Sequence, residues 1–249
     1  MNSWVGIGRS EVGLVREANQ DAFITIDPLG LWAVADGMGG HAGGEVAAQL
    51  AIASIKAHAE LLADTLRQGH TTSPQFLAEL IAQAHRAILG RAQLEPRLKG
   101  MGTTLVMLMI HSSDRPEAHV AHLGDSRAYR FHAGVLTPLT RDHTLIEKYL
   151  ACGILTEKTA RTHPERHVLT RALGMSAPMK PSLSSSPLEK EDLLLLCSDG
   201  LTKMLEDDEI RTVMGEANGD PIRACDHLID ASLERGGTDN VTVVVIGHT

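Results

Sequence analysis

Aspartates stand where several apolar runs of this sequence begin or end. The run LWAVAD ends at Asp36 and leads into a glycine-rich stretch over residues 37–44. A charged carboxylate beside an apolar strand is costly to desolvate unless a positive group meets it. The same arrangement recurs along the chain, at Asp21, Asp36, Asp125, Asp199 and Asp239. Together these positions indicate a site that holds a cation, a phosphate group or both.

These carboxylates offer oxygen ligands, which select hard cations. If several of them converge, their mutual repulsion raises their pKa values unless a cation lies among them. The sequence has no cysteine and histidine set of zinc spacing, so Mg²⁺ or Mn²⁺ is favoured. His119 and His122 are an odd number of residues apart on an expected strand. They should therefore face opposite ways and have ordinary roles.

Each of these residues taken alone has a plainer interpretation. Asp-Gly and Asp-Asn pairs often do no more than make turns. Asp125 could be such a turn residue, paired with Arg127. Cys197 directly precedes Ser198 and Asp199 and could be mistaken for a nucleophile, but it ends an apolar run and is expected to pack in the core.

Other phosphate and hydrolase chemistries lack their motifs in this sequence. It contains no Walker A loop, no H-R-D or D-F-G of protein kinases, no G-x-S-x-G and no H-E-x-x-H. No cysteine is followed by arginine at the six-residue offset of cysteine-dependent phosphatases. The glycines of 37–44 admit positive φ and let the backbone approach a ligand closely. What remains is hard-metal chemistry on an anionic substrate, and two adjacent metal ions suit an in-line attack at phosphorus.

The composition is that of a soluble globular protein. The 249 residues are 43% hydrophobic, and the net charge of −8 with no long basic run disfavours nucleic acid or an anionic membrane as a partner. The three cysteines share no C-x-x-C spacing and are expected to be reduced thiols. No signal peptide is visible, and the longest apolar runs fall short of the ~18 residues of a membrane span. We expect a cytoplasmic protein.

The hydrophobic pattern predicts one α+β domain that takes in the whole chain. Strands are expected at 4–8, 22–27, 31–36, 103–110, 118–124, 127–134, 192–200 and 240–247. Helical spacing predicts a helix over 44–63, a second one capped by Ser73 with Pro74 at its first position, and two more before the last strand. Residues 141–174 form a polar, helical insertion, and the SSSP stretch at 184–187 is expected to be a loop.

Seven short motifs follow one another in a fixed order. They are REANQDAF, VADGMGGHAGGEVA, GMGTTLV, HLGDSRAYR, RDHTL, LLLCSDGLTKML and GGTDNVTVVV. From about Gly8 to Ile246 the chain resembles the metal-dependent Ser/Thr protein phosphatases of type 2C, and the compact bacterial members most of all. This resemblance implies a four-layer α/β/β/α sandwich of two antiparallel sheets flanked by helices. It also implies a helical flap at about 141–174, over a two-metal centre.

The resemblance implies ligand roles for four aspartates and one glycine. Asp36 would bridge the two metal ions, and the carbonyl of Gly37 would bind one of them. Asp199 and Asp239 would complete the coordination of the other ion. Asp21 would act mainly through metal-bound water.

Three more residues are implied in catalysis or substrate binding. Arg16, five residues before Asp21, matches the phosphate-binding arginine of the family. Asn240 would lie beside the substrate phosphate. Asp125 would hold a weaker third ion together with Asp199. We therefore expect Arg16, Asp36 and Asp125 to contribute to catalysis.

Two positions depart from the pattern of the animal members. Gln20 stands where those members have a glutamate, so that the metal nearby should rely more on water ligands. Met38 stands where they have a histidine proposed as general acid. His41 is close in sequence, but nothing transfers the role to it. The proton donor for the leaving group is left open.

The predicted activity is that of a metal-dependent protein Ser/Thr phosphatase. Two Mn²⁺ or Mg²⁺ ions would neutralise the phosphomonoester, and a hydroxide shared between them would attack phosphorus while Arg16 holds the equatorial oxygens. The expected partners are phosphorylated proteins and an opposing Ser/Thr kinase, and the chain is expected to be a monomer. Two alternatives are a phosphohydrolase of small phosphate esters and an inactive phosphatase-like binding module. The second should have lost metal aspartates that this chain retains.

Overall fold

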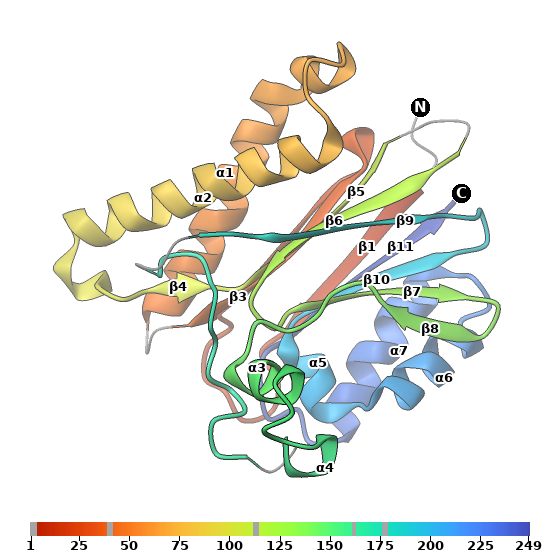
Figure 1. The fold of residues 1–249 in the computed structure, drawn as a ribbon. Coiled ribbons are helices and arrows are strands. Elements are labelled where there is room, and N and C mark those ends of the chain that lie inside the picture. Colours follow the sequence, from red (N-terminus) through yellow and green to blue (C-terminus); the bar gives the residue numbers. More distant parts are fainter. Residues whose placement is uncertain (1–3, 39–41, 112–114, 161–162, 176–178) are drawn as a thin grey trace.

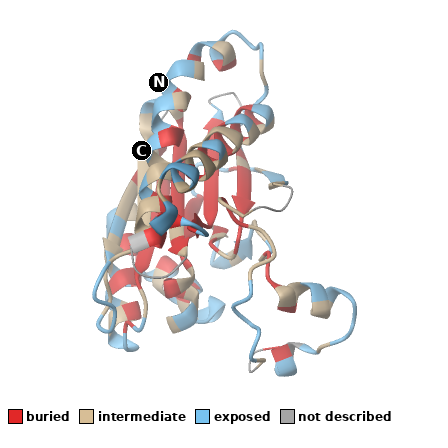
Figure 2. Cartoon of the chain, turned by 90° about the vertical axis from the view of Figure 1, so that its left-hand side faces the viewer, coloured by how far each residue is buried: buried red, intermediate tan, exposed pale blue. Residues whose placement is uncertain are grey.

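The computed structural model describes residues 4–38, 42–111, 115–160, 163–175 and 179–249. Two antiparallel sheets lie face to face, and helices cover the outer side of each (Figure 1). Buried residues concentrate on the strands and on the helix faces that contact them (Figure 2). The α+β sandwich of two antiparallel sheets flanked by helices is therefore confirmed.

The first sheet joins the two ends of the chain. Its strands, in order across the sheet, are β1 (Trp4–Glu11), β11 (Val241–His248), β10 (Leu193–Cys197), β7 (Arg127–His132) and β8 (Val135–Pro138). It is covered by α5 (Asp199–Met204), α6 (Asp207–Glu216) and α7 (Pro221–Glu234). Leu195 and Val243 pack toward these helices, whereas their neighbours Leu194 and Val244 pack between the sheets. Because successive side chains of a strand point to opposite faces of the sheet, each of these strands contributes to two cores.

The second sheet carries the glycine-rich segment. Its strands are β2 (Asp21–Ile26), β3 (Leu31–Met38), β5 (Leu105–His111), β6 (Glu117–Leu123) and β9 (Ser182–Pro187), and the short β4 (Gly102–Thr103) pairs with β3. The long helices α1 (Ala42–Arg67) and α2 (Ser73–Leu94) pack on its outer face. Two 3₁₀ turns complete this half, η1 (Asp27–Leu29) and η2 (Pro96–Leu98).

The sheets meet around Trp32 of β3, which is fully buried. A Cβ at Gly6 of β1 would lie 2.2 Å from Trp32 Nε1, so the close approach of the two sheets requires glycine there. The indole Nε1–H donates to Asp27 Oδ1 at 2.7 Å. Burying an indole of this size is a major source of the stability of the interface between the sheets.

An inserted segment between β8 and β9 contains two short helices. These are α3 (Leu145–Ala151), capped by the Thr144 side chain, and α4 (Glu157–Ala160). Both lie within the polar insertion expected at 141–174. Figure 1 shows them at the end of the molecule where α5 begins.

Three local predictions were wrong, one because of a long-range strand pairing and two in the number or start of helices. The SSSP stretch lies in β9, an edge strand whose backbone pairs with β6 although most of its side chains are exposed. Three helices, rather than two, stand between β10 and β11. The cap of α2 is Thr72, whose hydroxyl accepts from Gln75 N–H, while Ser73 is already inside the helix.

Helix α1 is long and apolar enough to cross a membrane by length and composition alone. It is rich in alanine, so it does not read as one continuous apolar run in the sequence. Its residues Ala47, Ala51 and Ile55 are fully buried against the second sheet, which is the packing of a core helix. A core helix passes the same criterion as a membrane span, so this feature is weak support for a membrane role.

Candidate metal centre

The predicted carboxylates converge at one end of the sandwich. Asp21 and Asp36 stand opposite each other in the pairing of β2 with β3. Asp199 follows β10 at the start of α5, and the other two aspartates flank strands β6 and β11. A cavity of about 720 Å³ is lined by Arg16, Gln20, Asp36, Gly37, Met38, Asp125, Asp199, Asp239 and Asn240. The fold therefore gathers nearly all the predicted site residues into one place, with Asp21 beside Asp36 on the neighbouring strand.

Burial and mutual repulsion disfavour the charged form of three of these carboxylates. Burial raises the pKa of Asp36 well above its ordinary value, and the charges of Asp21, Asp199 and Asp125 add to the effect. Burial likewise raises the pKa of Asp21 to about 6, although the Ser198 and Thr242 hydroxyls oppose it. Burial and the Asp199 charge raise the pKa of Asp125 to about 7. Such a cluster is stabilised by a divalent cation.

The donor set fits a hard cation in chemistry. Within the described part of the chain, no three His, Cys, Asp or Glu side chains are yet drawn together as a metal site. Lys203 Nζ instead bridges Asp199 and Asp239, because it lies 2.6 Å from Asp199 Oδ2 and 2.7 Å from Asp239 Oδ2. A metal ion could bind the other oxygen of Asp199, but at Asp239 it would compete with Lys203 and Arg16, which contact both carboxylate oxygens.

The backbone of Asp36 is fixed from the adjacent strand. Asp36 N–H donates to Thr104 Oγ1 at 3.1 Å, and the Asp36 carbonyl accepts from Thr103 Oγ1 and Thr104 N, both at 2.9 Å. At Gly37 a Cβ would lie 2.2 Å from the carbonyl oxygen of Gly44. Glycine at 37 is therefore required by the close approach of the α1 N-terminus, which keeps this edge of the site free of side chains.

Asp21 is held by a chain of hydroxyl groups. Ser198 Oγ donates to Asp21 Oδ2 at 2.7 Å and accepts from Thr242 N–H at 3.0 Å. Thr242 Oγ1 in turn contacts Ser10 Oγ at 2.7 Å. These bonds link both sheets to one carboxylate, so its position is set by the tertiary fold.

Arg16 and Lys203 supply the positive charge around Asp239. Arg16 Nε lies 2.8 Å from Asp239 Oδ1, and about half of the arginine side chain (53%) is exposed. Burial alone would raise the pKa of Asp239, but the hydrogen bonds and charges of Lys203 and Arg16 outweigh it and lower that pKa. Lys203 was missed in the sequence, although its spacing of four residues from Asp199 on a helix was a readable signal.

Asn240 braces the loop that carries Arg16. Its Oδ1 accepts from Gln20 N–H at 2.9 Å, and its Nδ2 donates to the carbonyls of Val12 and Ala18, each at 2.9 Å. Both amide hydrogens are thus used within the protein. These contacts place Asn240 in support of the loop, and it also lines the cavity, so its place beside the substrate phosphate stays a prediction.

The turn at Asp125 is held by a buried histidine. Gly124 has a φ of +103°, and a Cβ there would lie 2.6 Å from the Thr104 side chain. His143 N–H donates to the Gly124 carbonyl at 2.9 Å, and His143 Nδ1 accepts from Gly124 N–H at 3.2 Å. Burial and neighbouring cationic groups lower the pKa of His143 to about 3, so its ring is neutral.

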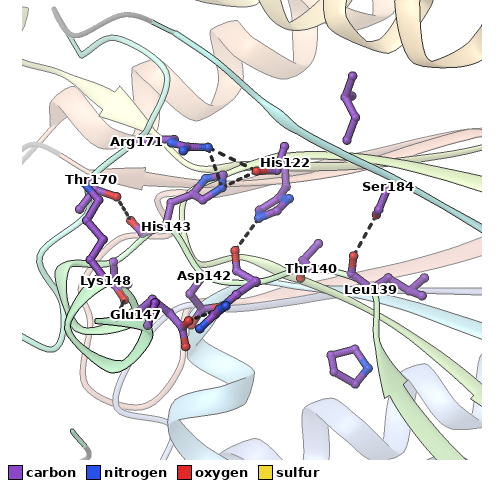
Figure 3. Close-up of a pocket in the computed structure, with 16 residues that line it drawn as sticks. His122, Leu139, Thr140, Asp142, His143, Glu147, Lys148, Thr170, Arg171 and Ser184 are labelled. Carbon is purple, nitrogen blue, oxygen red and sulfur yellow. Dashed lines mark hydrogen bonds and ion pairs between the residues drawn. The ribbon is translucent and has the colours of Figure 1, made fainter. Parts of the chain in front are cut away.

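This histidine also lines a second cavity (Figure 3). It has a volume of about 520 Å³, and α3 and β9 contribute to its walls. His143 stacks on His122 with ring centres 4.3 Å apart, and its Nε2–H donates to Ser182 Oγ at 2.8 Å. Thr170 on the same wall donates to the His143 carbonyl from both its N–H and its hydroxyl. The flap is thereby tied to the turn that presents Asp125.

The alternative pairing of Asp125 with Arg127 is not what the structure shows. Arg127 donates from Nε and Nη2 to the two carboxylate oxygens of Asp142, each at 2.8 Å. This bidentate pair anchors the start of the flap to β7 and leaves Asp125 facing the metal cavity. His167, which follows α4, also lines that cavity and was not predicted. His41 lies outside the described residues.

This geometry can be compared with known proteins. The family model for protein phosphatase 2C matches residues 14–229. The chain belongs to the protein phosphatase 2C family. It is 34% identical over 250 residues to a putative protein phosphatase 2C-type of Streptococcus pyogenes, covering 96% of this chain and 95% of that protein. It is also 34% identical to the serine/threonine phosphatase stp of Listeria monocytogenes, covering 96% and 93%.

Solved structures of phosphatases share the fold. The serine/threonine phosphatase PstP/Ppp of Mycobacterium tuberculosis matches with a TM-score of 0.85 and 36% identity, covering 98% of each chain. The family and the enzyme class predicted from the sequence are confirmed: this phosphatase 2C chain is a metal-dependent Ser/Thr protein phosphatase.

Cys197 of this phosphatase is expected to be dispensable for catalysis. The side chain is fully buried at the end of β10, and burial raises the pKa of its thiol to about 12. A protonated thiol is a poor nucleophile. Cys197→Ala should retain turnover of p-nitrophenyl phosphate and lose about 1–2 kcal/mol of unfolding free energy, measured by urea denaturation. Cys225→Ala is the control, because burial also raises the pKa of the Cys225 thiol to about 12. A folded but inactive Cys197→Ala would contradict this assignment.

His143→Ala should destabilise the protein through Gly124. The buried Gly124 N–H would lose its acceptor, which costs about 1–3 kcal/mol of unfolding free energy. His119→Ala is the matched control, because His119 bonds Ser185 at the exposed β6–β9 edge and should cost less. Equal losses in the two variants, by urea denaturation, would show that His143 does not support the turn.

Proposed function

We propose that this enzyme removes phosphate from phosphoserine and phosphothreonine in proteins at a dinuclear metal centre built around Asp36. The observation that carries the proposal is the convergence of buried carboxylates with raised pKa values on one cavity that also has an arginine at its rim. The catalytic domain of PstP has been solved in complex with two manganese ions, and it is 35% identical to this chain over 98% of both. Phosphorylated proteins are the substrates that follow from the family.

The ligands of the two ions are proposed residue by residue. Asp36 would bind both ions, and the Gly37 carbonyl would bind one of them. Asp199 and Asp239 would hold the other ion. Asp21, which pairs with Asp36 across the strands but does not line the cavity, would act through water. When bound, two Mn²⁺ or Mg²⁺ ions would neutralise the phosphate and lower the pKa of a bound water. A weaker third ion beside Asp125 is part of the same family expectation.

Arg16 is proposed to grip the substrate phosphate. Its Nε is held by Asp239, which orients the guanidinium at the cavity rim. Among the described residues only Nε of Arg16 is engaged, so its two terminal nitrogens can form a charge-assisted fork with phosphate oxygens. Asn240 contributes by fixing the loop from Val12 to Gln20, on which Arg16 lies.

The proton donor for the leaving oxygen is not assigned to a side chain here. Met38 lines the cavity and has no proton to give. His167 also lines it, but burial and the Lys203 charge lower the pKa of its imidazole, which disfavours the protonated form. Water in the cavity is the donor that we propose.

The cellular setting is proposed from general chemistry. Cys152, Cys197 and Cys225 are free thiols, which fits a reducing compartment, and we propose a cytoplasmic location. An opposing Ser/Thr kinase is required to supply the phosphorylated substrates. The net charge of −8 favours a soluble monomer that binds neither nucleic acid nor membranes.

Metal removal tests the centre directly. EDTA should abolish hydrolysis of p-nitrophenyl phosphate, and Mn²⁺ or Mg²⁺ should restore it, because the ligands are oxygens. The restored enzyme should prefer a phosphothreonine peptide to a nucleotide, which separates a protein phosphatase from a phosphohydrolase of small esters. Full activity after exhaustive chelation would rule out the dinuclear proposal.

Arg16→Ala should weaken substrate use and leave Mn²⁺ affinity close to wild type. Loss of a charge-assisted contact costs about 1.5–3 kcal/mol, roughly ten- to a hundredfold in kcat/KM. Arg9→Ala is the matched control, because Arg9 is also about half exposed and is paired with Asp226 outside the cavity. Unchanged kinetics for Arg16→Ala on a phosphopeptide would make Arg16 an ordinary surface residue.

A further inference from the structure

Lys203 places an ammonium group among the carboxylates of the metal centre. Its Nζ is within 2.7 Å of both Asp199 Oδ2 and Asp239 Oδ2, and 28% of its side chain is exposed. The lysine also lines the cavity onto which Asp36 and Asp125 open. A fixed positive charge of the chain itself thus stands where the family resemblance leads one to expect metal ions alone.

The packing of α5 directs Lys203 to this place. Asp199 and Lys203 are four residues apart, so their side chains share one helix face. The first turn of α5 is pressed against the segment that leads into β11, because a Cβ at Gly200 would lie 1.9 Å from the Asn240 carbonyl oxygen. Asp239, the residue before Asn240, is thereby brought within reach of Lys203. The contact follows from a tight backbone approach, and not from a freely swinging surface lysine.

The Lys203 charge acts beyond the two carboxylates that it contacts. Burial raises the pKa of Asp36 and of Asp125, and the Lys203 charge works in the opposite direction at both carboxyls. Asp125 and Asp199 form the pair at which a third ion was expected. A divalent ion at that pair would have to share Asp199 with the ammonium, and like charges repel strongly in a half-buried site.

We propose that the Lys203 ammonium takes the place of the third metal ion in this chain, neutralising Asp199 beside Asp125, so that the centre holds two ions. The proposal rests on the dinuclear centre proposed above. Asp199 has two carboxylate oxygens, so Lys203 can keep one of them while a metal ion takes the other. The metal ion shared by Asp199 and Asp239 also needs an oxygen of Asp239. Because Arg16 holds Asp239 Oδ1, Lys203 must release Asp239 Oδ2 when that ion binds. Lys203 is therefore a positioning residue that sets how many ions the cavity accepts.

The test is a count of the Mn²⁺ ions bound to the chelator-stripped chain. It uses isothermal titration calorimetry and the electron paramagnetic resonance signal of free Mn²⁺. The wild type should bind two ions. Lys203→Asp puts a carboxylate on the helix face of Asp199 and should bind a third Mn²⁺ at a free Mn²⁺ concentration at least tenfold below any at which the wild type binds one. Lys203→Met removes the charge without adding a ligand and should fall between them.

Two controls locate the third ion. Lys190→Asp makes the same charge change at an exposed position outside the cavity and should leave two ions bound. Adding Asp125→Ala to Lys203→Asp should remove the third ion, because that ion depends on the Asp125 carboxylate. Circular dichroism and thermal melting in EDTA establish whether each variant is folded. If Lys203→Asp does not fold, Lys203→Met is compared with the wild type instead.

The outcomes separate this proposal from the proposed function. A third ion in the wild type with the affinity found in the Lys203 variants would overturn the role of Lys203, and so would two ions in every folded Lys203 variant. Fewer than two ions in the wild type would instead contradict the dinuclear centre itself.

Discussion

Repulsion between buried carboxylates is the constraint around which this end of the molecule is organised. Asp21 and Asp36 face each other across the pairing of β2 with β3, and Asp199 and Asp125 arrive from other strands. The Asp199 charge raises the pKa of Asp21, Asp36 and Asp125, on top of the larger effect of burial, and Asp21 and Asp125 also raise that of Asp36. Divalent cations relieve this repulsion, so metal binding and the packing of the two sheets at this edge are coupled. The folded site is built to be completed by ions.

Neutral polar groups hold these charges in place from behind. The hydroxyls of Thr103 and Thr104 fix the backbone of Asp36, and Ser198 fixes the carboxylate of Asp21. His143 plays the corresponding part for the turn at Gly124. Among the described residues, no buried side-chain nitrogen or oxygen lacks a hydrogen-bond partner. A fully satisfied network of this kind keeps ligands within the narrow geometry that metal catalysis requires.

Two cationic side chains of the site, Arg16 and Lys203, have different roles. Arg16 is half exposed at the rim, where a guanidinium fork can receive phosphate, whereas Lys203 is more enclosed and touches two prospective metal ligands. A rigid planar fork suits bidentate recognition of an anion, and a compact ammonium suits the replacement of a metal ion. The flap adds a third element, because Asp142 and His143 at its base connect it to β7 and to the turn before Asp125.

The sequence by itself determined the features that depend on local periodicity and residue type. Alternating apolar runs specified most strands, and an aspartate at the border of such a run fell at the site edge because strand ends meet there. Tertiary structure alone decided the rest. The polar β9 is a strand because β6 offers it a backbone edge, and Asn240 turns to the loop because three backbone groups there need partners. Lys203 meets Asp239, 36 positions away, because α5 packs on the entry to β11. Contacts of this kind join segments that are distant in sequence, and no local pattern encodes them.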